Sequence, residues 1–176
     1  MATFTKIADY TLPSNTTTYT FNNLGTYSDL FVVANVRCTG TPDRNALALR
    51  FNESTVAEYT YKRMYYIGDT NAKGVDYDTG DRLLLGYIPS GGIGPSNYFS
   101  ATTIYIPSYR DSNLPKPVLT DSSAIGDNKT KSGLSQTSGI WANNSPINSV
   151  TFGTWDNWGS AQLVQNSNFT IYGIQN

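Results

Sequence analysis

The segment Trp155-Asp156-Asn157-Trp158-Gly159 carries the residue types in this sequence that are best suited to bind a ligand. A sugar ring offers an apolar face and several hydroxyls, and an aromatic ring beside Asp or Asn side chains complements both. The candidate carbohydrate-binding residues are therefore Trp155, Asn157 and Trp158. The pattern favours an alternative, structural role for the two indoles. In that role they would cap the open end of a β-sandwich or lie in a contact between subunits.

Four tyrosines, Tyr59, Tyr61, Tyr65 and Tyr66, stand in the run 59–67 (YTYKRMYYI). The run alternates like a strand, with the first three tyrosines on one side and Tyr66 on the other. These side chains are candidates for a sugar-binding platform. They are equally suited to a protein interface, because tyrosine buries a large area at low entropic cost.

Three carboxylates, Asp76, Asp78 and Asp81, cluster around Gly80 in the stretch VDYDTGD. This density of oxygen atoms with a central glycine is a candidate calcium site. The stretch lacks the bidentate glutamate that closes a hand-type calcium loop, and it has no flanking helices. The pattern therefore favours an acidic surface loop that precedes a strand.

The sequence contains no histidine. This absence removes the usual general base, the serine and cysteine triads that depend on it, and most catalytic zinc sites. Glu53 and Glu58 are the only glutamates, and the aspartates stand mostly in turn contexts, where Asp is common. Cys38, the single cysteine, lies in an apolar run and is expected to be a small buried residue. We therefore predict a protein that is not an enzyme and needs no cofactor.

Charge and hydropathy patterning argue against two classes of partner. Twelve Lys and Arg residues against 13 Asp and Glu give a net charge of -1, with no basic stripe to neutralise phosphates, so nucleic acid is not expected. No apolar run approaches the ~20 residues that cross a bilayer. Residues 1–10 lack the basic and apolar regions of a signal peptide. We expect neither membrane insertion nor Sec-type export.

Short β-rich runs separated by Gly, Pro, Asn, Asp and Ser make up the chain, and no helical periodicity is sustained. The run 99–109 (FSATTIYIPSY) alternates with period two, and its strand is expected to stop where Pro107 removes a backbone donor and the polar turn 108–113 follows. The length fits one domain, 1–176. The pattern predicts an all-β fold, a single-domain antiparallel β-sandwich that is jelly-roll-like. The expected strands are 3–12, 16–21, 29–38, 46–51, 59–67, 82–88, 99–109, 116–123, 133–141, 147–154 and 169–174.

The connections between these strands are predicted as well. Residues 13–15 (Pro-Ser-Asn) are turn material, which would join the first two strands into a hairpin. Residues 69–80 are predicted to form a long loop rich in Gly, Asp and Asn. The nearly unbroken apolar run 82–88 favours a central position in its sheet.

An ordered set of motifs, which spans nearly the whole chain, resembles a family of small phage virion proteins common among phages of aquatic bacteria, cyanobacteria included. The motifs are strand patterns, and none is catalytic. The TWDNWG segment (154–159) lies outside them. The motifs are YSDLFVVANVR (27–37), LRFN (49–52), YTYKRMY (59–65), IYIPSY (104–109), GIWANNSPINSVTF (139–152) and IYGI (171–174).

The resemblance implies a structural protein on the virion surface, made in the host cytoplasm. It would be a capsid decoration, a head-fibre subunit or part of a tail fibre. Its implied partners are other virion proteins, of capsid or tail, and further copies of itself in a homo-oligomer such as a trimer. The alternative function is a receptor-binding module, which would hold a host surface glycan through Trp155, Asn157, Trp158 and nearby tyrosines.

Overall fold

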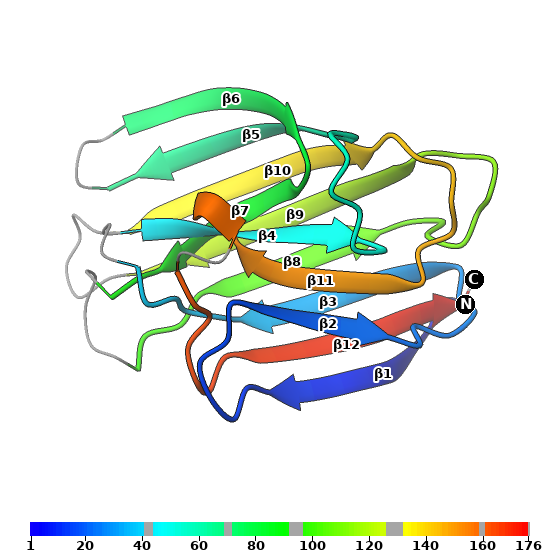
Figure 1. Ribbon diagram of the computed structural model, residues 1–176, viewed down its shortest axis with the longest axis horizontal. Coiled ribbons are helices and arrows are strands. Elements are labelled where there is room, and N and C mark those ends of the chain that lie inside the picture. The colour runs from blue at the N-terminus through cyan, green and yellow to red at the C-terminus, as the bar shows by residue number, and fades with distance from the viewer. Residues whose placement is uncertain (41–43, 69–71, 92–96, 126–131, 159–160, 176) are drawn as a thin grey trace.

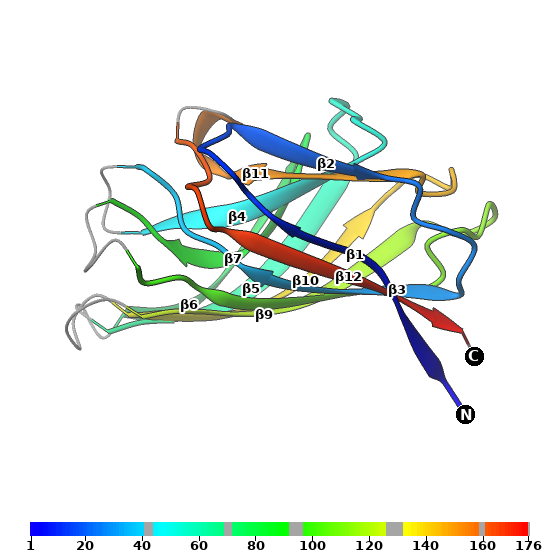
Figure 2. The ribbon, with the colours of Figure 1, turned by 90° about the horizontal axis from the view of Figure 1, so that it is seen from below.

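The chain forms two antiparallel β-sheets that face each other (Figures 1 and 2). The computed structural model describes residues 1–40, 44–68, 72–91, 97–125, 132–158 and 161–175. Within these residues there are twelve strands, a short 3-10 helix, η2 (Asp156–Trp158), and no α-helix. That part of the chain also has no helix long and apolar enough to cross a membrane. The predicted all-β, antiparallel, jelly-roll-like sandwich is confirmed.

The larger sheet has eight strands in the order β1-β12-β3-β8-β9-β10-β5-β6. The first and last strands of the chain, β1 and β12, are antiparallel neighbours at one edge, while β6 forms the other edge (Figure 1). The strands are β1 (Thr3–Thr11), β3 (Asp29–Asn35), β5 (Tyr59–Ile67), β6 (Ala72–Gly80), β8 (Ala101–Ile106), β9 (Lys116–Ala124), β10 (Gly133–Trp141) and β12 (Asn168–Gln175).

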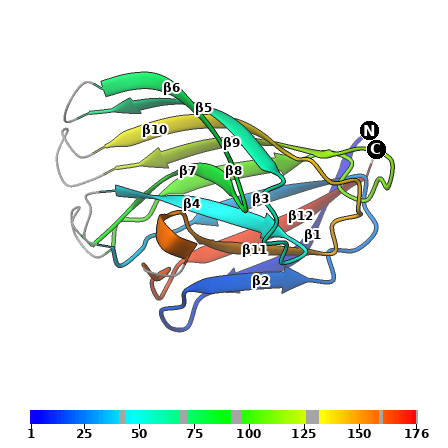
Figure 3. The ribbon, with the colours of Figure 1, turned by 45° about the horizontal axis from the view of Figure 1, so that its top comes forward.

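The smaller sheet has four strands in the order β2-β11-β4-β7. Because it is narrower, it covers only part of the inner face of the larger sheet. Its edge strand β7 packs on β9 and β10, so β5 and β6 extend beyond it (Figure 3). The strands are β2 (Thr18–Asn22), β4 (Arg44–Phe51), β7 (Leu83–Pro89) and β11 (Ser149–Thr154).

Alternating side chains from both sheets fill the core, and its largest members are aromatic. The rings of Phe152 and Phe169 stack across the sandwich with centroids 4.8 Å apart. Trp141 stacks on Tyr59 at 6.2 Å. Cys38 is fully buried, as predicted, and burial raises the pKa of its thiol to about 11.

Buried hydroxyls join β7 to the larger sheet. The pairing of β4 with β7 skips Leu85 at a β-bulge, so the Leu85 carbonyl finds its partners across the sandwich. The hydroxyls of Thr120 and Thr137 donate hydrogen bonds to that carbonyl oxygen, and Ser122 donates to the Tyr87 carbonyl oxygen at 2.8 Å. We call this set of contacts the hydroxyl seam. It satisfies backbone groups of an edge strand that would otherwise be buried without partners.

The predicted hairpin of residues 3–12 and 16–21 is wrong. β1 pairs with β12 in the larger sheet, whereas β2 pairs with β11 in the smaller one. The chain crosses between the sheets at Leu12, which is buried in the core. Burial of this apolar side chain between two layers outweighs the local turn signal of residues 13–15.

The predicted loop 69–80 is also wrong over its described part, 72–80, all of which belongs to β6. This strand pairs with β5 along its whole length. Its alternation places Val75 and Tyr77 on the outer face and Asp76 and Asp78 on the inner face. The turn-forming residue types hide that alternation in the sequence, because β6 is an edge strand with solvent on one side.

β7 lies at the edge of its sheet and not at the centre, contrary to the prediction from the run 82–88. All of its residues except Tyr87 are nonetheless buried. The larger sheet covers one face of β7, and its partners in the hydroxyl seam replace a neighbouring strand. The unbroken apolar run therefore reflects burial of β7 against the larger sheet and not a central position in its own sheet.

Candidate functional site

The outer face of the larger sheet carries most of the exposed large apolar side chains of the described residues. Seven of them lie on four neighbouring strands, β6, β5, β10 and β9. Cross-strand pairing places Tyr66 opposite Leu134, and Met64 opposite Val75. Large apolar side chains gathered on one exposed face make it a candidate site for binding another molecule, although polar side chains such as Lys62 and Gln136 lie among them. We call it the apolar strip; it consists of Met64, Tyr66, Val75, Tyr77, Leu119, Leu134 and Ile140.

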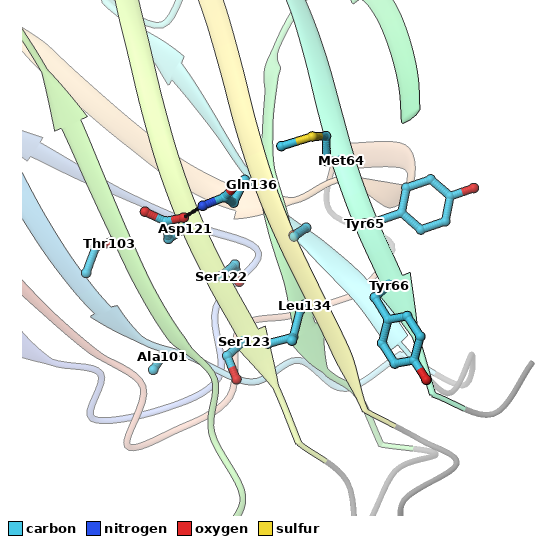
Figure 4. A pocket seen from close by; sticks show the side chains of 11 residues that line it. Met64, Tyr65, Tyr66, Ala101, Thr103, Asp121, Ser122, Ser123, Leu134 and Gln136 are labelled. Atoms are coloured by element: carbon cyan, nitrogen blue, oxygen red, sulfur yellow. Dashed lines mark hydrogen bonds between the residues drawn. The ribbon is translucent and has the colours of Figure 1, made fainter. Parts of the chain in front are cut away.

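Two hollows lie side by side along the apolar strip. The first, of about 510 Å³, forms where small side chains such as Ala101 and Ser123 stand near the larger Leu134 (Figure 4). The second, of about 540 Å³, adjoins it over β9, β10 and β5. Gln136 and Asp121 line both hollows, and the Gln136 amide donates a hydrogen bond of 2.7 Å to the Asp121 carboxylate.

A second concave site opens between the sheets, where β5 and β6 extend beyond β7. It has a volume of about 250 Å³, and we call it the inter-sheet groove. The Trp155 N–H donates a hydrogen bond of 2.8 Å to the Ala46 carbonyl oxygen, which holds the segment before η2 against β4. The inner face of β5 and β6 contributes Tyr61, Arg63, Asp76 and Asp78. The facing wall includes Asn45, Tyr87, Trp155 and Asp156.

Cross-strand pairs organise the charges of the groove. Arg63 lies opposite Asp76 and donates hydrogen bonds to both carboxylate oxygens, one of them at 3.1 Å. The guanidinium also lies 4.6 Å from the ring centroid of Tyr87. Burial lowers the pKa of Arg63, but the hydrogen bond to Asp76 and nearby negative charge outweigh burial, so the pKa is raised overall. Arg63 is therefore a fixed cation at the side of the groove.

Two polar groups of the groove have no hydrogen-bond partner among the described residues. The Nδ2 atom of Asn45 is buried and unpaired. The hydroxyl of Tyr61, which lies opposite Asp78, makes no hydrogen bond to that part of the chain either. Asn45 is 5% exposed and Tyr61 is 6% exposed. Buried polar groups are normally paired, so the Asn45 Nδ2 group offers an unfilled contact to an oxygen-bearing ligand or water, and the Tyr61 hydroxyl, which solvent can reach, offers a second contact.

The tyrosines of β5 predict a loss of stability at high pH. Burial raises the pKa of Tyr61 from 10.0 to about 12, and burial raises the pKa of Tyr59 as well. The unfolded chain loses these protons near pH ~10, whereas the folded chain retains them. Their contribution is therefore fully present below about pH 10 and is lost as the pH rises toward about 12.

Urea unfolding at about pH 8, 10 and 11 should give progressively lower midpoints, and a Tyr61→Phe variant should lose less of its stability over the same interval. Equal losses in the two proteins would contradict this assignment.

The indoles of Trp155 and Trp158 lie in different sites, so the predicted three-residue sugar site is not one surface. Trp155 lines the inter-sheet groove edge-on to Tyr61, with ring centroids 5.6 Å apart. Trp158 lines a separate hollow of about 180 Å³, with the Arg50 guanidinium 4.3 Å from its ring centroid. The turn of η2, in which Trp158 has a φ of 33°, lies between the two indoles. The side chain of Asn157 lies outside the described residues.

The predicted platform of four tyrosines is not formed. Tyr59 is in the core, where its hydroxyl accepts a hydrogen bond of 2.8 Å from the Phe51 N–H. Tyr61 lines the groove, Tyr65 is half-buried on the same inner face, and Tyr66 belongs to the apolar strip. The side of β5 that carries three of the tyrosines faces the other sheet. This orientation depends on the position of the second sheet and not on β5 itself.

The candidate calcium ligands Asp76, Asp78 and Asp81 do not converge. Asp76 binds Arg63, and Asp81 binds Arg50 beyond the end of β6. Only Asp76 and Asp78 line the groove. Among the described residues, no three His, Cys, Asp or Glu side chains are grouped so as to hold a metal ion.

Several residues of these sites are not singled out by the sequence. Asn45 joins the groove only because β4 approaches β5 across the sandwich. Leu119 and Leu134 are apolar but lie on the outer faces of β9 and β10, whose inner faces carry hydroxyls such as Thr120. The sequence feature that could have revealed them is an alternation of the opposite sense to the usual one, in which serine and threonine face the core and leucine faces solvent. The hydroxyl seam explains it, since those hydroxyls are needed in the core.

Comparison with known proteins gives no family for this chain. No protein-family model matches it, and no curated protein sequence does. Among solved structures, it is similar to NanB bound to Optactamide, with a TM-score of 0.36 and 10% identity over 95% of this chain but only 26% of that chain. It is also similar to peanut lectin with a 9mer peptide, with a TM-score of 0.34 and 7% identity over 99% of this chain and 92% of the lectin.

A third similar structure is a legume lectin-like domain from Entamoeba histolytica, with a TM-score of 0.23 and 8% identity over 96% of this chain and 88% of that one. These scores are too low to support a conclusion about ligand or function. The functional argument therefore rests on the chain's own residues.

Proposed function

We propose that this protein is a non-enzymatic structural subunit of a phage virion surface, which assembles through the apolar strip. The strip is the observation that supports the proposal: seven large apolar side chains are exposed on four adjacent strands. Removing apolar surface from water contributes roughly 25 cal/mol per Å². A partner that covers the strip gains this free energy.

The partner on the strip is a second copy of this chain. Its composition fits a protein interface, because Met and Tyr are enriched in interface cores. A two-fold axis parallel to the strands and between β5 and β10 lays β6 of one copy over β9 of the other. That arrangement puts Lys73 of one copy near Asp121 of the other, so this pair of charges is complementary.

Support for the virion setting comes from the resemblance of the sequence motifs to those of small phage virion proteins. A particle-surface subunit needs a stable fold and faces that dock onto neighbours, and it needs no catalytic constellation. The sandwich and the apolar strip meet these requirements. The proposed partners in the particle are capsid or tail proteins in addition to further copies of the chain.

Sedimentation velocity at micromolar concentration should show a self-associated protein. The Leu134→Lys variant should raise the dissociation constant by at least about 100-fold, because the contact would bury an unpaired charge. Leu114→Lys is the matched control, since Leu114 is 53% exposed and Leu134 is 55% exposed but Leu114 lies off the strip. A monomeric wild-type protein, or equal effects of the two variants, would contradict the proposed interface.

Antibodies raised against the purified protein test the virion setting separately. They should label intact particles of the phage that encodes the chain, as seen by immunogold electron microscopy. Unlabelled particles that also lack the protein after dissociation would exclude the virion location, whatever the sedimentation result.

A further inference from the structure

We propose that the inter-sheet groove binds a single neutral sugar unit of a glycan. The groove lies on the inner face of β5 and β6, whereas the apolar strip lies on their outer face. The two sites are therefore separate, and binding in the groove does not depend on assembly through the strip.

The size and lining of the groove suit one sugar ring. Its volume of about 250 Å³ is below the ~300–1,000 Å³ of pockets for drug-sized ligands. Trp155 and Tyr61 meet edge to face, with ring planes at 89° to each other, and form an aromatic corner. The C–H groups of a pyranose ring can pack in such a corner while its hydroxyls face the polar wall.

The unfilled polar contacts of the groove match sugar hydroxyls. The Asn45 Nδ2 group is a donor without a partner in the described chain, and the Tyr61 hydroxyl is a donor or an acceptor with none. Asp78 adds an acceptor, since within the described chain only one of its carboxylate oxygens accepts a hydrogen bond, from Thr79 N–H. A hydroxyl both donates and accepts, so adjacent hydroxyls of one ring can satisfy groups of both kinds.

The charge of the groove selects a neutral ligand. One cation, Arg63, and three carboxylates, those of Asp76, Asp78 and Asp156, line it, and the Arg82 guanidinium lies 5.2 Å from the ring centroid of Trp155, so the formal charge around the groove is -1. The Arg63 guanidinium is already bound to Asp76 and is not available as an anion clamp. Sialic acids, uronic acids and sulfated sugars are therefore disfavoured by repulsion.

Nuclear magnetic resonance of the ¹⁵N-labelled protein tests the proposal. The probes are the methyl glycosides of glucose, galactose, mannose and N-acetylglucosamine, and the signal is the Trp155 indole N–H. At least one probe should shift this signal with a dissociation constant on the order of millimolar, whereas N-acetylneuraminic acid should not. A signal unmoved by all four probes, shifts confined to the Trp158 indole, or equal binding of the acid would overturn the proposal.

Two tyrosine variants on the same strand supply the matched controls. Tyr61→Phe removes only the hydroxyl from the groove and should weaken binding of the active probe by about tenfold, a loss typical of one ligand hydrogen bond. Tyr66→Phe makes the same change on the outer face and should leave sugar binding unchanged. Unaltered binding by Tyr61→Phe would overturn the assignment of the site.

The Leu134→Lys variant separates the groove from the strip. It should bind the sugar like the wild-type protein even where it no longer self-associates. If the wild-type protein does not self-associate but its Trp155 signal still shifts with the sugar, the proposed assembly is wrong and the groove assignment stands.

Discussion

Replacing Trp141 by alanine should lower the free energy of unfolding by about 4 kcal/mol, within the range for truncating a buried aromatic side chain. The Trp141 indole is buried, stacks on Tyr59 and lies with its ring centroid 5.5 Å from that of Phe51. Its Nε1–H donates a hydrogen bond of 3.1 Å to the Glu58 carboxylate. The substitution therefore leaves a cavity between the sheets and removes a donor from a charged acceptor.

The neighbouring residue supplies the control for this prediction. Ile140 is next to Trp141 on β10, but its side chain lies on the outer face and is exposed. Ile140→Ala should change the free energy of unfolding by about 0.5 kcal/mol or less, as for most surface substitutions. Urea unfolding followed by circular dichroism measures both variants. Similar midpoints for the two would show that the Trp141 cluster is not a stabilising part of the core.

Gly86→Ala should destabilise the protein by about 3 kcal/mol, because backbone strain and overpacking act together. Gly86 has a φ of 152°, where a side chain is disfavoured, and it follows the β-bulge at Leu85. A Cβ atom at this position would lie 2.3 Å from the Cβ of Ser122 and 2.8 Å from the Oγ of Ser135. Relief of this clash requires β7 to move away from β9 and β10, which breaks the hydroxyl seam.

Gly80→Ala is the matched control, since a Cβ atom on Gly80 would meet no atom within 4 Å. Its backbone φ is outside the range that favours glycine, so alanine should be neutral or should stabilise the protein by about 0.4–1 kcal/mol. Thermal and urea unfolding of both variants tests the prediction. A Gly86→Ala protein as stable as the Gly80→Ala protein would show that β7 is not tightly held on the larger sheet.

Some strands could be predicted from the sequence to the residue. β5 and β10 have the predicted bounds 59–67 and 133–141, because turn-forming residues follow each run, GDTN (68–71) after β5 and NNS (143–145) after β10. β6 was missed, since its aspartates and glycines are turn formers in most contexts. An edge strand can accept them because one of its sides faces water.

The position of each strand in the sandwich could not be predicted in the same way. The apolar run of β7 gave no indication that the strand lies at an edge. Packing against the other sheet excludes water from a strand in the same way as a neighbouring strand on each side does. The turn residues after β1 likewise could not show that the chain changes sheets. Both outcomes depend on which distant strands pair, and that choice is made by the whole core.

The candidate sites show the same division at the level of side chains. The sequence identified Trp155, Tyr61 and the aspartates of β6 as ligand-binding candidates, each for its own chemistry. It assigned Tyr61 to a tyrosine platform and Trp155 to a site with Trp158. The structure places Tyr61 and Trp155 together, adds Asn45, and separates Trp158 from them.

The sequence by itself determined the all-β class, because period-two alternation and frequent turn residues are local properties of the chain. Tertiary structure alone decided which face of each strand is covered, and with it the apolar strip and the inter-sheet groove. The physical reason is that alternation assigns side chains to two faces without saying which face meets the other sheet. The smaller sheet decides this by packing on one face of the larger sheet. The outer face of the larger sheet stays exposed, and β5 and β6 extend beyond the smaller sheet.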